Sequence, residues 1–162
     1  MKKHRIAAYI LIVAMAAFLS ACGGDKATES STGEQMPEEK SEKILQLKIG
    51  DTAVEVAWEE NESVEAIKRL CEKDPLTIQM SMYGGFEQVG PIGTGLPSND
   101  VQTTTTSGDI ALYSGNHMVV FYGSNTWEYT MLGHIKDQDK TGMTGLLSNG
   151  DVTISVSMED KE

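Results

Sequence analysis

The sequence predicts a mainly β domain, a small closed or nearly closed barrel covered by one helix. Short segments of alternating apolar and polar residues recur between residues 44 and 156, and glycine-rich turns separate them. Such segments are typical of half-buried strands, and a single segment has a helical period instead. Seven aromatic residues lie between Met80 and Ile135, so we expect this stretch to form most of the β core.

The chain begins with the features of a secretory leader. Three basic residues in the first five positions precede an apolar run from Ile6 to Phe18, which is short for a bilayer span. The run ends in Leu19-Ser20-Ala21-Cys22, which resembles the lipobox of bacterial lipoproteins. We therefore expect residues 1–21 to be a lipoprotein signal peptide and Cys22 to carry the lipid, palmitate included, that anchors the chain in the membrane. An ordinary secretory signal and an uncleaved anchor helix are the alternatives.

The composition is acidic, and cysteine is scarce. The chain has 24 acidic and 13 basic residues, a net charge of −11, and loss of the leader removes three basic residues to give −14. Phosphate backbones repel such a surface, so we expect no nucleic-acid partner. Once Cys22 is lipidated, Cys71 is the only cysteine left, which excludes a disulfide framework and a cysteine-based metal cluster. We expect Cys71 on the buried face of a helix.

The chain divides by composition into a tether and a folded part. Residues 22–43 are almost all polar, charged or glycine, a composition typical of a flexible tether behind the lipidated cysteine. The folded domain is expected over residues 44–158, with a short tail at 159–162.

The first half of the domain predicts a hairpin, a helix and a strand. Apolar residues alternate on both sides of Gly50-Asp51, which predicts a hairpin between Ile44 and Trp58. Between Asn61 and Cys71 the apolar residues recur at helical spacing, acids lie in the first turn and bases near the end. Alternation returns in residues 76–82, which predicts a strand.

The second half predicts further strands. Residues 90–99 are rich in glycine and proline and predict a long irregular loop, and Thr103–Thr106 suits an edge strand. Turns at residues 107–109, 114–116 and 123–125 separate three more strands. The Asn149-Gly150 pair predicts a terminal hairpin between residues 146 and 156.

Four short blocks, in this order, resemble the bacterial cyclophilin-like domain family. The blocks are Met82-Tyr83-Gly84-Gly85-Phe86-Glu87, Leu96-Pro97-Ser98-Asn99-Asp100, Ser107-Gly108-Asp109-Ile110-Ala111-Leu112-Tyr113, and Val120-Phe121-Tyr122-Gly123-Ser124-Asn125 followed by Trp127. The resemblance covers residues 44–158 and implies a closed eight-stranded β-barrel with one capping helix. It implies no particular activity, because a fold alone does not carry function.

The residues argue against peptidyl-prolyl isomerisation, the activity of true cyclophilins. In those enzymes an arginine shortly after a phenylalanine faces the substrate amide, whereas here Gln88 stands at the comparable position. Arg69, the only arginine of the mature chain, lies in the predicted helix. A neutral amide stabilises a twisted peptide bond less than a guanidinium does, so we assign no catalytic residue and lean towards a protein that is not an enzyme.

The sequence gives only weak signals for a metal site. Asp137 and Asp139 begin a segment like a calcium loop, but Ser148 takes the place of the bidentate glutamate. The two histidines of the mature chain, His117 and His134, lack the spacing of a zinc site. We therefore expect no metal and no cofactor. Side chains near glycine-rich turns are the candidate binding surface: Tyr83, Phe86, Gln88, Asn125 and Trp127.

The leading hypothesis is a non-catalytic, lipid-anchored binding or accessory module on the extracytoplasmic side of the cell membrane, which recognises a peptide or a small molecule. A foldase with peptidyl-prolyl isomerase activity and a structural subunit of an envelope complex are the two alternatives.

Overall fold

The computed structural model describes residues 42–161, which we call the domain. Its elements in chain order are β1 (Lys43–Ile49), β2 (Thr52–Val54), β3 (Val56–Trp58), α1 (Glu62–Leu70), β4 (Leu76–Gln79), β5 (Ser81–Tyr83), β6 (Glu87–Pro91), β7 (Val101–Thr104), β8 (Asp109–Tyr113), β9 (His117–Phe121), β10 (Thr126–Ile135), α2 (Lys140–Leu147) and β11 (Thr153–Asp160). The first strand starts one residue before the expected start of the domain, and the last strand ends two residues after its expected end.

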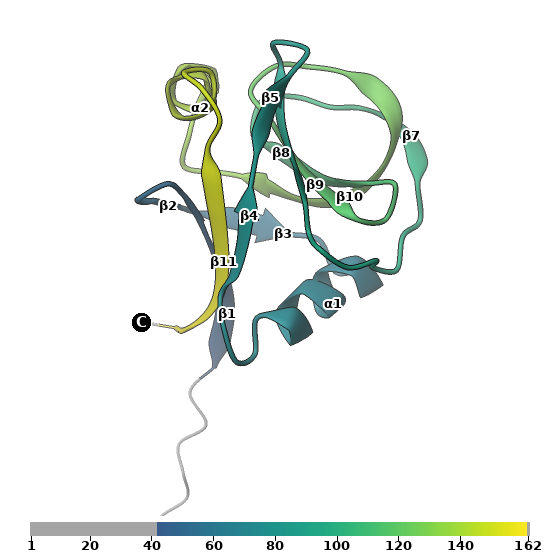
Figure 1. Ribbon diagram of the computed structural model, residues 1–162, viewed down its shortest axis with the longest axis vertical. Coiled ribbons are helices and arrows are strands. Elements are labelled where there is room, and N and C mark those ends of the chain that lie inside the picture. The colour runs from purple at the N-terminus through teal and green to yellow at the C-terminus, as the bar shows by residue number, and fades with distance from the viewer. Residues whose placement is uncertain (1–41, 162) are drawn as a thin grey trace, which may run out of the picture. The chain divides into compact units, whose positions relative to one another are not determined.

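The strands of the domain pair in two sheets (Figure 1). One sheet has the order β2-β1-β11-β4. The other, seven-stranded sheet has the order β3-β10-β8-β9-β6-β5, and its seventh strand, β7, pairs with the first half of β10. Every pairing is antiparallel. The prediction of a mainly β domain is confirmed.

The closed eight-stranded barrel that the resemblance implies is not confirmed, because the strands pair in two separate sheets. Only Glu55 separates β2 from β3, and only Met80 separates β4 from β5, so at these two residues the chain passes from one sheet into the other. Isolated backbone hydrogen bonds remain at the bends, where Lys136 N–H donates to the Glu55 carbonyl and Met80 N–H donates to the Val152 carbonyl, both at 2.8 Å. The regular ladders stop there, which divides the pairing into two sheets.

The main core lies between the two sheets, and a helix lies at each end of it (Figure 1). Both helices bury apolar side chains in this core, namely Val64 and Ile67 from α1 and Met143 and Leu147 from α2. The sheets contribute alternate residues of their strands, since successive side chains point to opposite faces. The core therefore fixes both sheets and both helices relative to one another.

The predicted helix is confirmed as α1. The side chain of Asn61 accepts a hydrogen bond from the Val64 N–H at 3.0 Å and so caps the first turn. Cys71 follows the last helical residue and is buried, as expected.

The expectations of one helix and of a terminal hairpin are wrong. Residues 140–147 form the second helix, α2, which Asp139 caps by accepting a hydrogen bond from the Gly142 N–H at 2.8 Å. β11 then pairs with β1 and β4 instead of with a neighbour across the Asn149-Gly150 turn. The burial of Met143 and Leu147, one turn apart, provides the tertiary contact that stabilises this glycine-containing helix.

A second, smaller apolar cluster lies on the other face of the seven-stranded sheet. Its buried members are Ala111, Val119, Phe121 and Tyr129. Phe121 belongs to this cluster and its neighbour Tyr122 to the main core, so the two rings point to opposite faces, as predicted. We call this side of the sheet the outer face.

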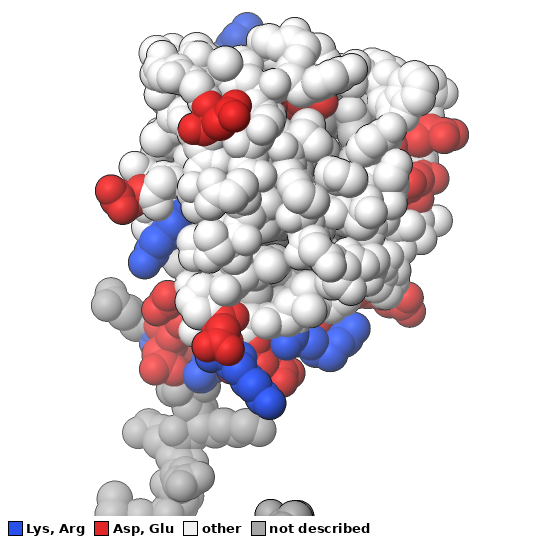
Figure 2. Space-filling model, viewed as in Figure 1, with Lys and Arg blue, Asp and Glu red and all other residues white. Residues whose placement is uncertain are grey.

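Charged side chains are unevenly distributed over the domain. In Figure 2 several lysine and arginine side chains gather with acids at the lower end of the view, near the start of β1. Further acids lie in the upper part and along the right edge, and the middle of the face is uncharged. The acid excess is therefore not spread evenly over the visible face.

Candidate ligand pocket

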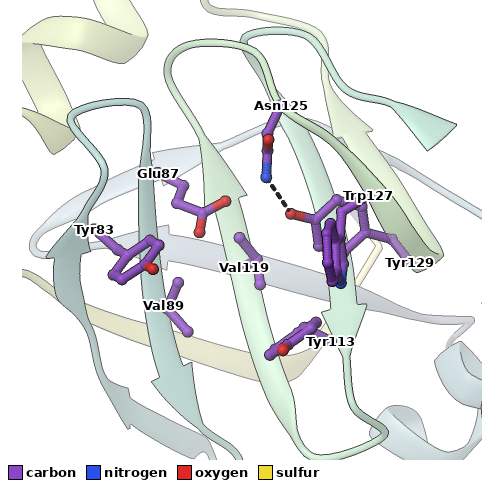
Figure 3. A pocket seen from close by; sticks show the side chains of 8 residues that line it. All are labelled: Tyr83, Glu87, Val89, Tyr113, Val119, Asn125, Trp127 and Tyr129. Atoms are coloured by element: carbon purple, nitrogen blue, oxygen red, sulfur yellow. Dashed lines mark hydrogen bonds between the residues drawn. The ribbon is translucent and has the colours of Figure 1, made fainter. Parts of the chain in front are cut away.

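A pocket of about 420 Å³ lies on the outer face of the seven-stranded sheet (Figure 3). Four of its lining residues are aromatic: Tyr83 of β5, Tyr113 of β8, and Trp127 and Tyr129 of β10. The other four are Glu87 and Val89 of β6, Val119 of β9, and Asn125 in the turn before β10. Because side chains alternate along a strand, residues two apart such as Glu87 and Val89 reach the same pocket.

The aromatic rings form exposed walls and a buried floor. Tyr83 is 66% exposed, Trp127 56% and Tyr113 39%, which is unusual for large apolar side chains. Tyr129 is buried and packs edge-on against Phe121 and Tyr113, with ring centroids 5.4 Å and 6.2 Å apart. Exposed rings gathered around one hollow indicate a site for a ligand with an apolar part.

The polar groups of the pocket are few and well placed. The Asn125 amide donates a hydrogen bond to the Tyr129 hydroxyl at 2.9 Å, which fixes both side chains at one end of the pocket (Figure 3). Burial raises the pKa of the Tyr129 hydroxyl, and the negative charge of Glu87 adds to the effect. Tyr129 is therefore a neutral phenol throughout the physiological range.

Among the described residues, Glu87 is the only charged one that lines the pocket. It is 5% exposed, and its Oε2 atom has no hydrogen-bond partner in the described part of the chain. Burial raises the pKa of this carboxyl to about 7. The group therefore changes charge close to neutral pH, with no cationic side chain in the pocket lining to hold it ionised.

Three of the five predicted binding residues, Tyr83, Asn125 and Trp127, come together in this pocket. Phe86 does not line it; its ring is partly buried against the outer-face cluster. The three that meet come from β5 and from the turn and strand around residue 125, segments that are distant in the sequence.

The expectation that Gln88 presents its amide at the binding surface is wrong. Its side chain is fully buried, and its Nε2 atom donates to the carbonyls of Leu147 at 2.6 Å and Gly150 at 2.8 Å. Because Gln88 follows Glu87 on a strand, it points to the opposite face of the sheet, towards α2. Its role is to satisfy the carbonyl of the last residue of that helix and the carbonyl of Gly150 in the loop that follows.

Sequence reasoning did not select Glu87, Val89, Tyr113, Val119 and Tyr129. A signal for Glu87 was present, since it is the only charged residue between Pro75 and Asn99. A single acid in an otherwise uncharged strand region is either exposed or placed in a site. The strand register decides which, and the register comes only from the structure.

The remaining polar candidates have structural partners. Asp137 accepts a hydrogen bond from the Glu55 N–H at 3.0 Å, and Asp139 caps α2. His134 pairs with Asp109 at 2.7 Å. Within residues 42–161, no three histidine, cysteine or acidic side chains gather as metal ligands would.

The sequence model of the cyclophilin-like family matches residues 47–159. No curated protein and no solved structure matches the chain significantly. The matched residues include all eight that line the pocket.

Proposed function

The chain belongs to the cyclophilin-like family, and we propose that its domain is a non-catalytic module that binds a peptide or a small molecule in the outer-face pocket. The observation that carries this proposal is the set of exposed rings around one hollow, Tyr83, Tyr113 and Trp127. Aromatic walls with a few fixed polar groups are typical of binding sites for small organic groups.

The positions of the lysine and arginine side chains support a protein that binds its ligand without isomerising it. Twisting a prolyl amide against a barrier of about 20 kcal/mol requires a strong, preorganised donor beside the amide. Arg69 is exposed on α1, and no lysine or arginine of the described part of the chain lines the pocket. The Gln88 amide, the one neutral donor considered for this role, already donates to two carbonyls.

The proposal places the domain on the extracytoplasmic side of the cell membrane, held there by a lipid on Cys22. This cysteine, the signal peptide and the tether up to residue 41 lie outside the described residues. Neither α1 nor α2 is long and apolar enough to cross a bilayer. The basic and apolar leader followed by a small-residue cysteine motif supports the anchor.

The lipid anchor is tested by metabolic labelling with an alkyne analogue of palmitate. We expect the wild-type chain to take up the label and to sediment with membranes. The Cys22→Ser variant should lose the label and leave the membrane fraction. Equal labelling of both chains would refute the anchor without bearing on the pocket.

Ligand binding is tested with Trp127 as the reporter, because its indole lies in the pocket wall. The Trp58→Phe variant leaves Trp127 as the only tryptophan of the chain. We expect a saturable change in its fluorescence with at least one member of a series of blocked tripeptides, Ac-Gly-X-Gly-NH₂, that covers all side chains. The Trp127→Phe variant, with Trp58 retained, is the control and should show no such change.

Two other outcomes correspond to the two alternative functions. Turnover of proline tetrapeptides in a protease-coupled assay would make the protein a foldase and contradict the proposal. Absence of any saturable response, with stable capture of an envelope protein, would make it a structural subunit.

A further inference from the structure

The Glu87 carboxyl is built into the pocket without a partner. It is 95% buried, and its Oε2 atom has no hydrogen-bond donor in the domain. Figure 3 shows the carboxyl turned towards the space between Tyr83, Val119 and Tyr113. A buried acceptor that lacks a donor is costly for the fold, and such an orphan atom in a pocket marks the place where a ligand supplies the missing group.

The surroundings of Glu87 select the charge of that ligand group. Within residues 42–161, the lining contains one acid, no lysine, arginine or histidine, and four aromatic side chains whose ring faces carry negative partial charge. Tyrosine and tryptophan faces attract an ammonium cation, and most strongly where water is excluded. An anion is repelled by the same groups, and a neutral alkyl group leaves the Glu87 carboxyl without a donor.

From this geometry we infer that the pocket binds a protonated alkylamine, with its ammonium donating a hydrogen bond to the Glu87 carboxylate and its alkyl chain lying among Tyr83, Tyr113 and Trp127. The inference rests on the proposed binding function and names its ligand class. A single carboxylate among mostly apolar walls suits an ammonium, which is a compact point charge, better than a guanidinium, whose five N–H donors spread over a planar fork.

Because Glu87 must be ionised to bind the ammonium, the affinity should depend on pH, which apolar packing alone would not cause. The titratable groups that face it are the phenols of Tyr83, Tyr113 and Tyr129, and burial raises the pKa of the Tyr129 hydroxyl. His117 touches the ring of Tyr113 and does not line the pocket. The ammonium binds the ionised carboxylate, whose pKa is about 7, so affinity should fall as the pH drops below 7 and level off above it.

The experiment compares Ac-Gly-Lys-Gly-NH₂ with the same tripeptide that carries norleucine, which has a similar chain without the charge. We expect the lysine peptide to bind the Trp58→Phe protein at least about tenfold more tightly at about pH 8. n-Butylamine is the third probe: binding equal to that of the lysine peptide means that a free small amine suffices, and weaker binding means that the peptide backbone contributes. Equal affinity for lysine and norleucine would overturn the inference.

Two variants assign the effect to the carboxyl. Glu87→Gln keeps the shape and removes the charge, so it should lower the affinity for the lysine peptide about tenfold or more and abolish its pH dependence. Glu128→Gln removes the same charge from an exposed position on β10 outside the pocket. It should change neither the affinity for the lysine peptide nor the pH dependence of that affinity. Unchanged lysine binding in folded Glu87→Gln would refute the ammonium site. If the tripeptide series shows a different side chain to be the ligand, the binding function stands and this inference fails.

Discussion

At the scale of single residues, Glu87 makes the stability of the fold depend on pH. Its pKa is raised by burial from 4.5 to about 7 in the folded chain. In the unfolded chain the carboxyl is hydrated and titrates near its ordinary value. The folded state thus binds more protons than the unfolded state between these two values, and stability must depend on pH in that interval.

The first prediction follows from the sign of this linkage. Below about pH 4.5 both states hold the proton, so Glu87 has no effect; from there to about pH 7 its contribution to the free energy of unfolding falls, and above pH 7 the loss is complete. The full loss is at most about 3 kcal/mol. Urea unfolding should therefore find Glu87→Gln more stable than the wild type at about pH 8, with the difference vanishing near pH 4.5.

Glu128→Gln controls for the general effect of removing one acid. Its side chain is exposed, so its unfolding free energy should follow that of the wild type at both pH values. A difference between Glu87→Gln and the wild type that stays constant with pH would show that Glu87 is not the titrating group.

Glu87 and its neighbour Gln88 show how much of the site could be predicted from the sequence at this scale. The run Phe86-Glu87-Gln88-Val89 identified the correct strand, but the choice of Gln88 placed the binding group on the wrong face. Alternation predicts that Glu87 and Gln88 point in opposite directions without saying which one faces the core. The assembled sheet settles this, since β6 pairs with β9, which lies far along the chain, as well as with its neighbour β5.

At the scale of elements, local signals were sufficient for α1 and insufficient for α2. α1 has a capping asparagine, an acidic first turn, a basic last turn and a clear apolar face. α2 has the sequence KTGMTGLL, with two glycines and two threonines, and the Asn149-Gly150 pair beyond it favoured a turn between strands. Its helical state depends on the burial of Met143 and Leu147, which no local pattern announces.

The second prediction concerns the glycines, which are not equivalent. A methyl group at Gly145 in α2 meets no atom within 4 Å, whereas at Gly90 in β6 it would lie 2.5 Å from the Gln79 carbonyl oxygen. Gly145→Ala should therefore stabilise the domain by about 0.5–1 kcal/mol, because alanine loses less backbone entropy in a helix. Gly90→Ala should destabilise it by about 1–3 kcal/mol through overpacking.

Thermal unfolding of the two variants beside Gly95→Ala provides the measurement. Gly95 lies in the loop before β7 and has open space around it, so its substitution reports the effect of an added methyl group alone. Destabilisation by Gly145→Ala would mean that α2 does not form as described.

At the scale of the whole domain, one core joins elements from both ends of the domain. β1 lies between β2 and the last strand, β11, and Cys71 at the end of α1 donates a hydrogen bond from its Sγ atom to the Val156 carbonyl at 3.3 Å. The sequence predicted strands and turns one at a time. It did not show that the first and last strands pair, or that the chain bends at Glu55 and Met80, because such contacts depend on the assembled core.

The last prediction uses Cys71 as a probe of that core. The thiol is buried, and burial raises its pKa, so both access and thiolate formation are suppressed in the folded domain. In a Cys22→Ser chain, which leaves Cys71 as the only cysteine, a thiol-reactive probe should modify Cys71 at least about a thousandfold more slowly than in urea-unfolded protein.

Glu72→Cys, added to the same chain, places a second thiol at the adjacent exposed position, which should react at the rate of unfolded protein. Because α1 shares its core with both sheets, the slow phase should have the same urea dependence as global unfolding. Rapid modification of Cys71 in native buffer, at the rate of the introduced thiol, would show that α1 opens independently of the sheets.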